Sequence, residues 1–146
     1  EQRHAYWYQD WAMGFGLTLE DLEFVEPPAA MDAVNNFLWT MGRQGSLEEG
    51  IAATNLAIEW ATGEWSQSVV KGMKAYQEDG VATINRHSMA WLRAHASYDD
   101  DHPHEAMELV KLLCVEQESR DRAFKASQRG LEYYIQALDY CWESAD

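Results

Sequence analysis

Two short stretches of the sequence place a carboxylate three residues before an imidazole. Glu1 precedes His4 at the start of the chain, and Asp99 precedes His102 in a second stretch that also contains His95. Residues three or four apart lie on the same face of a helix. At about 100° per residue, His95, Asp99 and His102 fall within roughly 60° of one another if one helix carries all three. Each stretch is therefore predicted to present a carboxylate and an imidazole to one point.

A third carboxylate, Glu59, lies inside an apolar run that extends from Leu56 to Trp60. An unpaired carboxylate in apolar surroundings is unfavourable, so Glu59 is expected to bind a metal, to pair or to be protonated. A hydrogen bond to a neighbouring tryptophan or tyrosine is the alternative. Two carboxylate-x-x-His pairs and a glutamate on another helix approach the ligand set of di-iron and di-manganese helical bundles. Carboxylates and imidazoles suit Fe(II) and Mn(II), whereas the lack of clustered thiols argues against structural zinc.

The same residues also have a purely structural interpretation. The Glu-x-x-His spacing of Glu1 and His4 occurs by chance in many helices. Pro103 disfavours helical geometry in the residue before it, and Asp101 would make a good N-cap for a helix that starts near Pro103. In this interpretation the acidic residues 99–101 cap a helix and carry solvated charge, and His102 only lies nearby.

The elements that must position these residues are predicted to be helices throughout. No Asn-Gly or Asp-Gly hairpin signal separates alternating runs, and the chain has 3 prolines. Thr18 is expected to cap a short turn, and Ser46 forms a capping box with Glu49. Helices are expected over residues 1–17, 29–43 and 46–61. A kink or a break is expected at Thr62-Gly63, followed by a segment to Gly80. Further helices are expected over 81–98 and 104–143, the last as one or two helices bent near Gly130. This pattern predicts one all-α domain over residues 1–146, or most of one.

The composition excludes several classes of partner. The chain has 146 residues, of which 47% are apolar, and it contains no apolar run of the ~20 residues that a membrane span requires. Its 11 basic residues against 25 acidic ones give a net charge of −14. This balance repels phosphate, so neither nucleic acid nor an anionic membrane surface is expected as a partner. The 2 cysteines are too few for a disulfide framework, which favours a cytoplasmic location. The chain opens on an aromatic run without an initiator methionine, so we expect that upstream helices are missing; a processed or engineered start is the alternative.

Three features recur in order along the chain: the aromatic stretch from His4 to Leu17, Glu59 before a tryptophan and Gly63, and the segment His95-x-x-x-Asp99-x-x-His102. In this order they resemble the haem-oxygenase-like superfamily, in its TenA/PqqC branch. The resemblance covers essentially the whole chain, as the C-terminal two-thirds of a domain. It implies a haem-oxygenase-like helical bundle that lacks its N-terminal helices.

Resemblance to the iron-containing redox members of this branch implies that the chain is a non-haem, metal-dependent oxidase or oxygenase. In them Fe, as a di-iron centre, reacts with O₂ and oxidises a small organic substrate such as an amino acid or a fatty acid. Trp91 stands where several di-iron members carry a further acidic residue, so one iron, or none, is the alternative. The resemblance implies catalytic roles for Glu59, His95 and Asp99, and the implied metal ligands are Glu1, His4, Glu59, His95, Asp99 and His102.

Other members of the branch imply different chemistry. Members similar to thiaminase II carry a nucleophilic cysteine roughly where this chain has Glu59, which speaks against hydrolysis of thiamin. A cofactor-free PqqC- or TenA-like enzyme would use the same His, Asp and Glu residues as acid and base. A non-catalytic helical protein that binds a ligand or another protein is the third alternative. Because other proteins of this fold oligomerise, we also expect a homo-oligomer.

Overall fold

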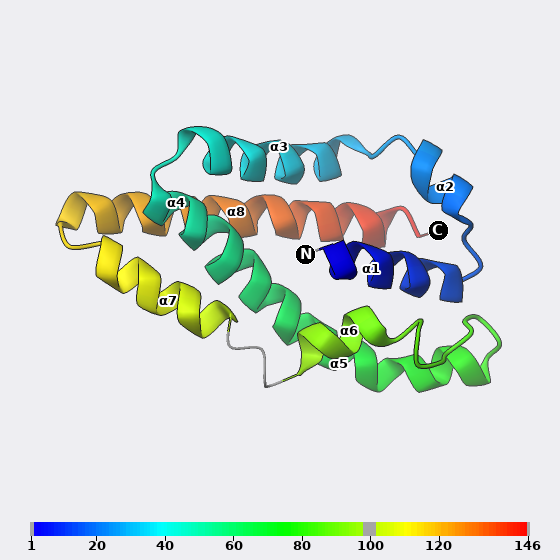
Figure 1. Cartoon of the computed structure of the whole chain (residues 1–146). Helices are drawn as coiled ribbons and strands as arrows, with labels where there is room; N and C mark the ends of the chain where they lie inside the picture. Colours follow the sequence, from blue (N-terminus) through cyan, green and yellow to red (C-terminus); the bar gives the residue numbers. More distant parts are fainter. Residues whose placement is uncertain (1, 98–101, 146) are drawn as a thin grey trace. The chain divides into compact units, whose positions relative to one another are not determined.

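The computed structural model describes residues 2–97 and 102–145, and every regular element in these two ranges is a helix (Figure 1). The predicted all-α fold class is therefore confirmed. Glu1 and Asp99 lie outside the described residues. In chain order the elements are α1 (Gln2–Gly14), α2 (Leu19–Phe24), α3 (Ala29–Gln44), α4 (Leu47–Ile51), the π-helix η1 (Ala52–Ile58), α5 (Glu59–Glu78), α6 (Ala90–Ala96), α7 (His102–Leu113) and α8 (Gln117–Glu143).

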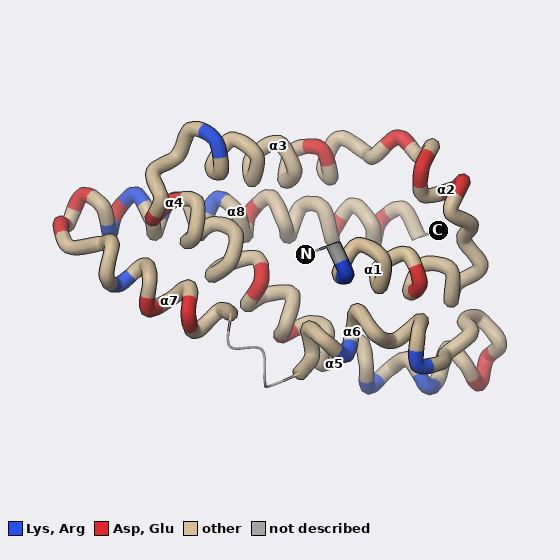
Figure 2. Tube along the Cα trace, viewed as in Figure 1, with Lys and Arg blue, Asp and Glu red and all other residues tan. Residues whose placement is uncertain are grey.

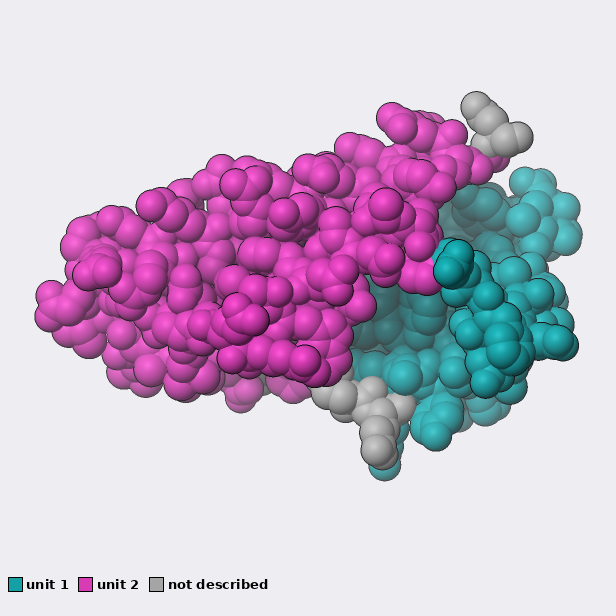
Figure 3. Space-filling model, turned by 90° about the horizontal axis from the view of Figure 1, so that it is seen from above, with its two compact units in different colours: residues 1–26, 62–100 teal, residues 27–61, 101–146 magenta. Residues whose placement is uncertain are grey.

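The chain forms two compact units, coloured separately in Figure 3. Unit 1 comprises residues 1–26 and 62–100, and unit 2 comprises residues 27–61 and 101–146. The boundary falls inside α5, close to Glu59. Each unit therefore holds some of the residues that the sequence analysis selected. Within the described ranges, no helix combines the length and the apolar character that crossing a membrane requires.

Unit 1 has an aromatic core. Helices α1 and α6 pack against each other, and the buried residues Met73, Met89 and Leu92 form the centre of the core. Trp11 and Trp91 pack onto this centre from α1 and α6. Large rings of this kind bury much apolar surface per residue, so a small unit can form a core from few helices.

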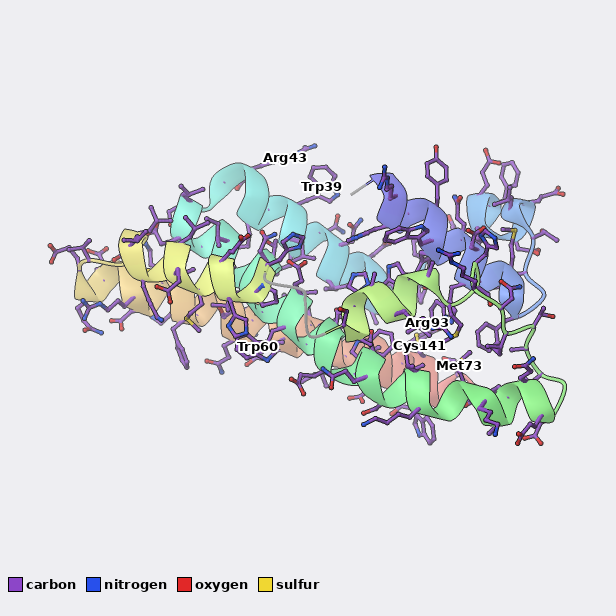
Figure 4. All side chains as sticks on the ribbon, turned by 60° about the horizontal axis from the view of Figure 1, so that its bottom comes forward. Trp39, Arg43, Trp60, Met73, Arg93 and Cys141 are labelled. Atoms are coloured by element: carbon purple, nitrogen blue, oxygen red, sulfur yellow. The ribbon has the colours of Figure 1, made fainter. Side chains whose placement is uncertain are left out.

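Unit 2 has a core of small side chains instead. Helix α8 packs along η1, α3 and α4, and α7 packs on η1 and α4. Ala52, Cys114 and Ala123 form a buried cluster where η1, the end of α7 and α8 meet. On α3, the Arg43 guanidinium lies 4.6 Å above the ring of Trp39, and Figure 4 shows the two side chains next to each other. Small core residues let helices approach closely, but they fill little volume.

Both capping motifs that the sequence predicts are present. The Asp21 amide donates to Thr18 Oγ1 (3.1 Å), and Asp21 Oδ2 accepts from the Thr18 amide (2.7 Å) at the start of α2. Glu49 Oε2 accepts from the Ser46 amide (2.9 Å) at the start of α4. Each box satisfies amide groups that a helix start leaves without partners.

Of the kink or break predicted at Thr62-Gly63, the break is wrong, because α5 runs through both residues. Gly63 has a packing role: a Cβ atom there would lie 3.3 Å from the carbonyl oxygen of His95. The glycine thus lets the end of α6 approach α5 closely, and this contact offsets the ~1 kcal/mol by which glycine disfavours a helix. The irregularity lies earlier, in the π-helical residues of η1.

The predicted helix over residues 81–98 is also too long. α6 covers only Ala90–Ala96, because the Asn85 side chain holds the preceding segment in a turn. Asn85 Oδ1 accepts from the amides of His87 (2.8 Å) and Ser88 (3.1 Å), as asparagine side chains often do in turns.

The predicted C-terminal helices are confirmed as two, but the interruption is not at Gly130. It falls between Leu113 and Gln117, and α8 continues through Gly130. A Cβ atom at Gly130 would lie 3.3 Å from the Ala53 carbonyl oxygen. As at Gly63, the absent side chain serves close packing.

An ion pair in unit 2 is expected to make stability depend on pH. The Arg122 guanidinium donates to Glu48 Oε1 at 2.7 Å and holds the pKa of this nearly buried carboxyl below its ordinary value. A lowered pKa means that the ionised form stabilises the fold above the ordinary glutamate pKa of about 4.3, and that this contribution is lost as the pH falls through the lowered value. Glu48→Gln is therefore expected to lower the unfolding free energy at neutral pH, and the difference from wild type should shrink in acid.

Urea unfolding at neutral and successively lower pH measures this difference. Glu118→Gln is the control, because Glu118 pairs with the same arginine (3.1 Å) but is exposed, and exposed pairs contribute little. A pH-independent difference for Glu48→Gln would contradict the assignment.

Candidate functional site

His95 is held by its own helix in a defined orientation. Its Nδ1 atom lies 2.8 Å from the carbonyl oxygen of Trp91, one turn earlier in α6. A carbonyl oxygen can only accept, so Nδ1 carries the proton and the lone pair of the neutral ring lies on Nε2. Metal-binding histidines characteristically donate their other ring N–H to a carbonyl or carboxylate in this way.

A second imidazole, that of His4, meets His95 in unit 1. The two ring centroids are 5.0 Å apart, and the His4 ring is 5.4 Å from that of Trp7. The contact arises because α1 and α6 pack against each other. Both histidines are half-buried. Helix packing thus brings together two histidines that are 91 positions apart in sequence.

Aromatic rings surround this histidine pair. The Trp91 ring lies 4.3 Å from His95, stacks on Trp11 at 5.6 Å and contacts Trp65 at 5.8 Å between centroids. Within the described chain, the buried atoms Trp11 Nε1 and Ser66 Oγ have no hydrogen-bond partner. An unsatisfied buried donor is unfavourable, so these two atoms stand out in the core of unit 1.

Glu59 and His102 form a separate pair in unit 2. His102 Nδ1 lies 3.2 Å from Glu59 Oε1, and 18% of the Glu59 side chain is exposed against 60% for His102. The hydrogen-bond partner of Glu59 is thus His102. From the sequence, a neighbouring tryptophan or tyrosine was the alternative for this role. Next to this pair, the rings of Trp60 and His104 are 5.3 Å apart.

The π-helix η1 sets the direction in which Glu59 leaves the chain. π-Helical segments are rare and often lie at functional sites. Here two hydroxyl groups bond to the carbonyls at its start: Thr54 Oγ1 donates to Gly50 (2.7 Å) and Ser127 Oγ to Ala52 (2.9 Å). Because a π-turn contains more residues than an α-turn, Glu59 is rotated relative to its place in a regular helix.

The structure brings together only some of the site residues that the sequence predicts. His95 and His102 do not share a helix face, because α6 ends at Ala96 and Ser97 is extended (φ −71°, ψ 132°). Glu1, Asp99 and the predicted cap Asp101 lie outside the described residues. Across residues 2–97 and 102–145, no three His, Cys, Asp or Glu side chains gather as a metal-binding group. The metal-binding roles of the predicted residues therefore remain predictions.

Sequence reasoning missed two contributions to this site. It treated Trp91 only as the replacement of an acidic residue, whereas its carbonyl orients His95 and its ring covers it. Trp91 and His95 are four residues apart, and this spacing, which places two residues on the same helix face, was the available signal. It also missed the unsatisfied Nε1 atom of Trp11, a ring that stacks on Trp91, because its burial depends on packing that the sequence does not show.

Comparisons with known proteins agree on the family and the fold. Residues 1–135 match the family described as iron-containing redox enzyme. The crystal structure of a TenA homolog from Pseudomonas syringae pv. tomato is similar, with a TM-score of 0.84 and 32% identity. The similarity covers 97% of this chain but 59% of that one, so this chain spans less than two thirds of that protein. The comparison with curated proteins found no match. The resemblance to the haem-oxygenase-like TenA/PqqC superfamily is thereby confirmed, and the chain belongs to the family of iron-containing redox enzymes.

Proposed function

We propose that this protein is an iron-dependent oxidase or oxygenase that acts on a small organic substrate with O₂. The observation that carries the proposal is the orientation of His95, whose Nδ1–H is bound to the Trp91 carbonyl and whose Nε2 lone pair is left for a metal, 5.0 Å from a second imidazole ring. Membership in the family of iron-containing redox enzymes supports it.

The donor types fit iron. His4, His95 and His102 supply imidazoles and Glu59 supplies a carboxylate, and ligands of these types suit Fe(II). In the proposal Glu1 and Asp99 complete the ligand set. Iron bound there would supply electrons to O₂.

The protein's own groups have distinct roles in this proposal. The Trp91 carbonyl keeps the proton on His95 Nδ1, which raises the basicity of Nε2. The rings of Trp11, Trp65 and Trp91 keep water away from the histidine pair, which protects a reactive site from side reactions.

A second candidate is a cofactor-free enzyme, and the Glu59–His102 pair favours it. A carboxylate that accepts from the Nδ1–H of a histidine orients the ring and stabilises its protonated form, and both effects suit a general base. The similarity to a TenA homolog supports this alternative. In it, a proton of the substrate passes to His102 while Glu59 stabilises the imidazolium.

Replacing Glu59 by alanine separates the two candidates. In the iron enzyme, Glu59→Ala removes a ligand, so Fe(II) binding in an anaerobic titration should be lost with little change in helical content by circular dichroism. Glu64→Ala, an exposed glutamate on the same helix, is the control and should bind Fe(II) as wild type does. Unchanged Fe(II) binding in Glu59→Ala would refute the role of Glu59, and full activity after exhaustive chelation would favour the cofactor-free enzyme.

A further inference from the structure

Unit 2 contains an open pocket that none of the predicted metal ligands lines. It lies between η1, the end of α7 and the first half of α8, and has a volume of about 430 Å³. Its inner wall is the cluster of small side chains Ala52, Cys114 and Ala123, and Phe124 stands at its rim. Binding sites for small molecules are typically apolar clefts of ~300–1,000 Å³ with a few fixed polar groups. The pocket therefore has the size and the wall of a ligand site.

Arg120 is a polar lining residue of this pocket whose guanidinium is held in place, and Lys111 and Ser127 also line the pocket. Its Nε donates to the Cys114 carbonyl and its Nη2 to the Val115 carbonyl, both at 3.0 Å. These two bonds hold the guanidinium plane in place at the turn between α7 and α8. A guanidinium has five N–H donors, so these bonds leave others for a further acceptor.

Arg120 is an exposed residue. Among the described residues, no carboxylate lies within ion-pair distance of it, although the chain carries a net charge of −14. Figure 2 shows other basic residues on α7 and the first half of α8. Most of them have carboxylate partners: Lys111 pairs with Glu108 (2.6 Å), Arg122 with Glu48 (2.7 Å) and Arg129 with Glu132 (2.8 Å).

The guanidinium of Arg120 lies at the carbonyl end of α7, because it donates to the Cys114 and Val115 carbonyls, and this end of a helix favours positive charge. Arg120 itself stands near the start of α8, where the helix dipole favours negative charge. An anion bound next to the guanidinium would therefore be favoured by the start of α8 as well as by Arg120.

We propose that this pocket binds an apolar carboxylate, whose carboxylate pairs with Arg120 and whose hydrocarbon part lies against Ala52, Ala123 and Phe124. An arginine fork matches a carboxylate in two parallel hydrogen bonds, which gives specificity for the charged end. Phe124 is 70% exposed without a ligand, and the hydrocarbon part would cover it. The proposal does not depend on iron and goes beyond the proposed function.

Binding is tested with phenylbutyrate as the probe and phenylbutanol as its neutral analogue, on metal-free protein. Calorimetry should give an affinity for phenylbutyrate at least tenfold higher than for phenylbutanol. Arg120→Met should remove this preference, whereas Lys125→Met, a basic residue on the same helix that does not line the pocket, should retain it. The comparison of the two ligands on unaltered protein needs no variant, so it decides the question even if Arg120→Met fails to fold.

The location of the ligand is tested through Cys114, whose side chain lines the pocket. In a Cys141→Ser chain, which removes the exposed cysteine, Cys114 is the remaining thiol. Saturating phenylbutyrate should slow its alkylation by iodoacetamide at least fivefold. Absence of binding, equal affinity for the alcohol, or binding that leaves the alkylation rate unchanged would each overturn the proposal. None of these outcomes bears on Fe(II) binding, so failure here is distinguishable from failure of the iron-dependent function.

Discussion

Replacing His95 by alanine is expected to lower the affinity for Fe(II) by more than the ~10–100-fold that loss of one outer-shell partner causes. The reason is that the variant removes an imidazole whose tautomer and orientation the Trp91 carbonyl has already fixed. It also removes the ring contact with Trp91 (4.3 Å), so unit 1 should lose about 1 kcal/mol of stability. Anaerobic Fe(II) titration and thermal unfolding measure the two effects separately.

His87→Ala is the matched control for this variant. His87 is an exposed histidine of unit 1 that lies in the turn before α6. It should change neither Fe(II) affinity nor stability. Equal Fe(II) affinity in the His95 and His87 variants would remove His95 from the ligand set, and an unaltered chain that takes up no Fe(II) would refute the iron-dependent function.

Gly130→Leu is expected to destabilise unit 2 by roughly 1–3 kcal/mol, the usual effect of overpacking. A Cβ atom at this buried position would lie 3.3 Å from the Ala53 carbonyl oxygen and 3.5 Å from the Phe37 ring. Leucine adds three further carbon atoms, and the backbone of η1 cannot give way as a flexible side chain would. The gain of about 1 kcal/mol in helix propensity offsets only part of this strain.

Gly42→Leu makes the same change on α3 in the same unit, at an exposed position where a Cβ atom meets nothing within 4 Å. Its unfolding free energy in urea should stay within about 0.5 kcal/mol of wild type or rise slightly. If the two leucine variants were equally stable, α8 and η1 would not pack as closely as the structure shows.

Local rules explain which parts of the fold the sequence determined by itself. The starts of α2 and α4 follow from Thr18 with Asp21 and from Ser46 with Glu49, because a capping box needs only residues three positions apart. The all-α class follows in the same way from helix signals and the absence of hairpin turns. Glycines gave wrong helix ends where tertiary contacts explain the glycine. Gly63 and Gly130 lie inside continuous helices, and the lack of a side chain at each lets a neighbouring backbone pack closely.

For the candidate site, the sequence determined the residue types, and the tertiary structure decided which of them meet. His95 and His102 were predicted to share a helix face, but the chain leaves the helix after Ala96 and His102 begins another one. The actual pairs are His4 with His95, through the packing of α1 on α6, and Glu59 with His102, through the contact of unit 2 helices. Helical spacing describes neighbours within one helix, whereas these contacts depend on where helices end and on which faces pack, and both are set by burial over the whole unit.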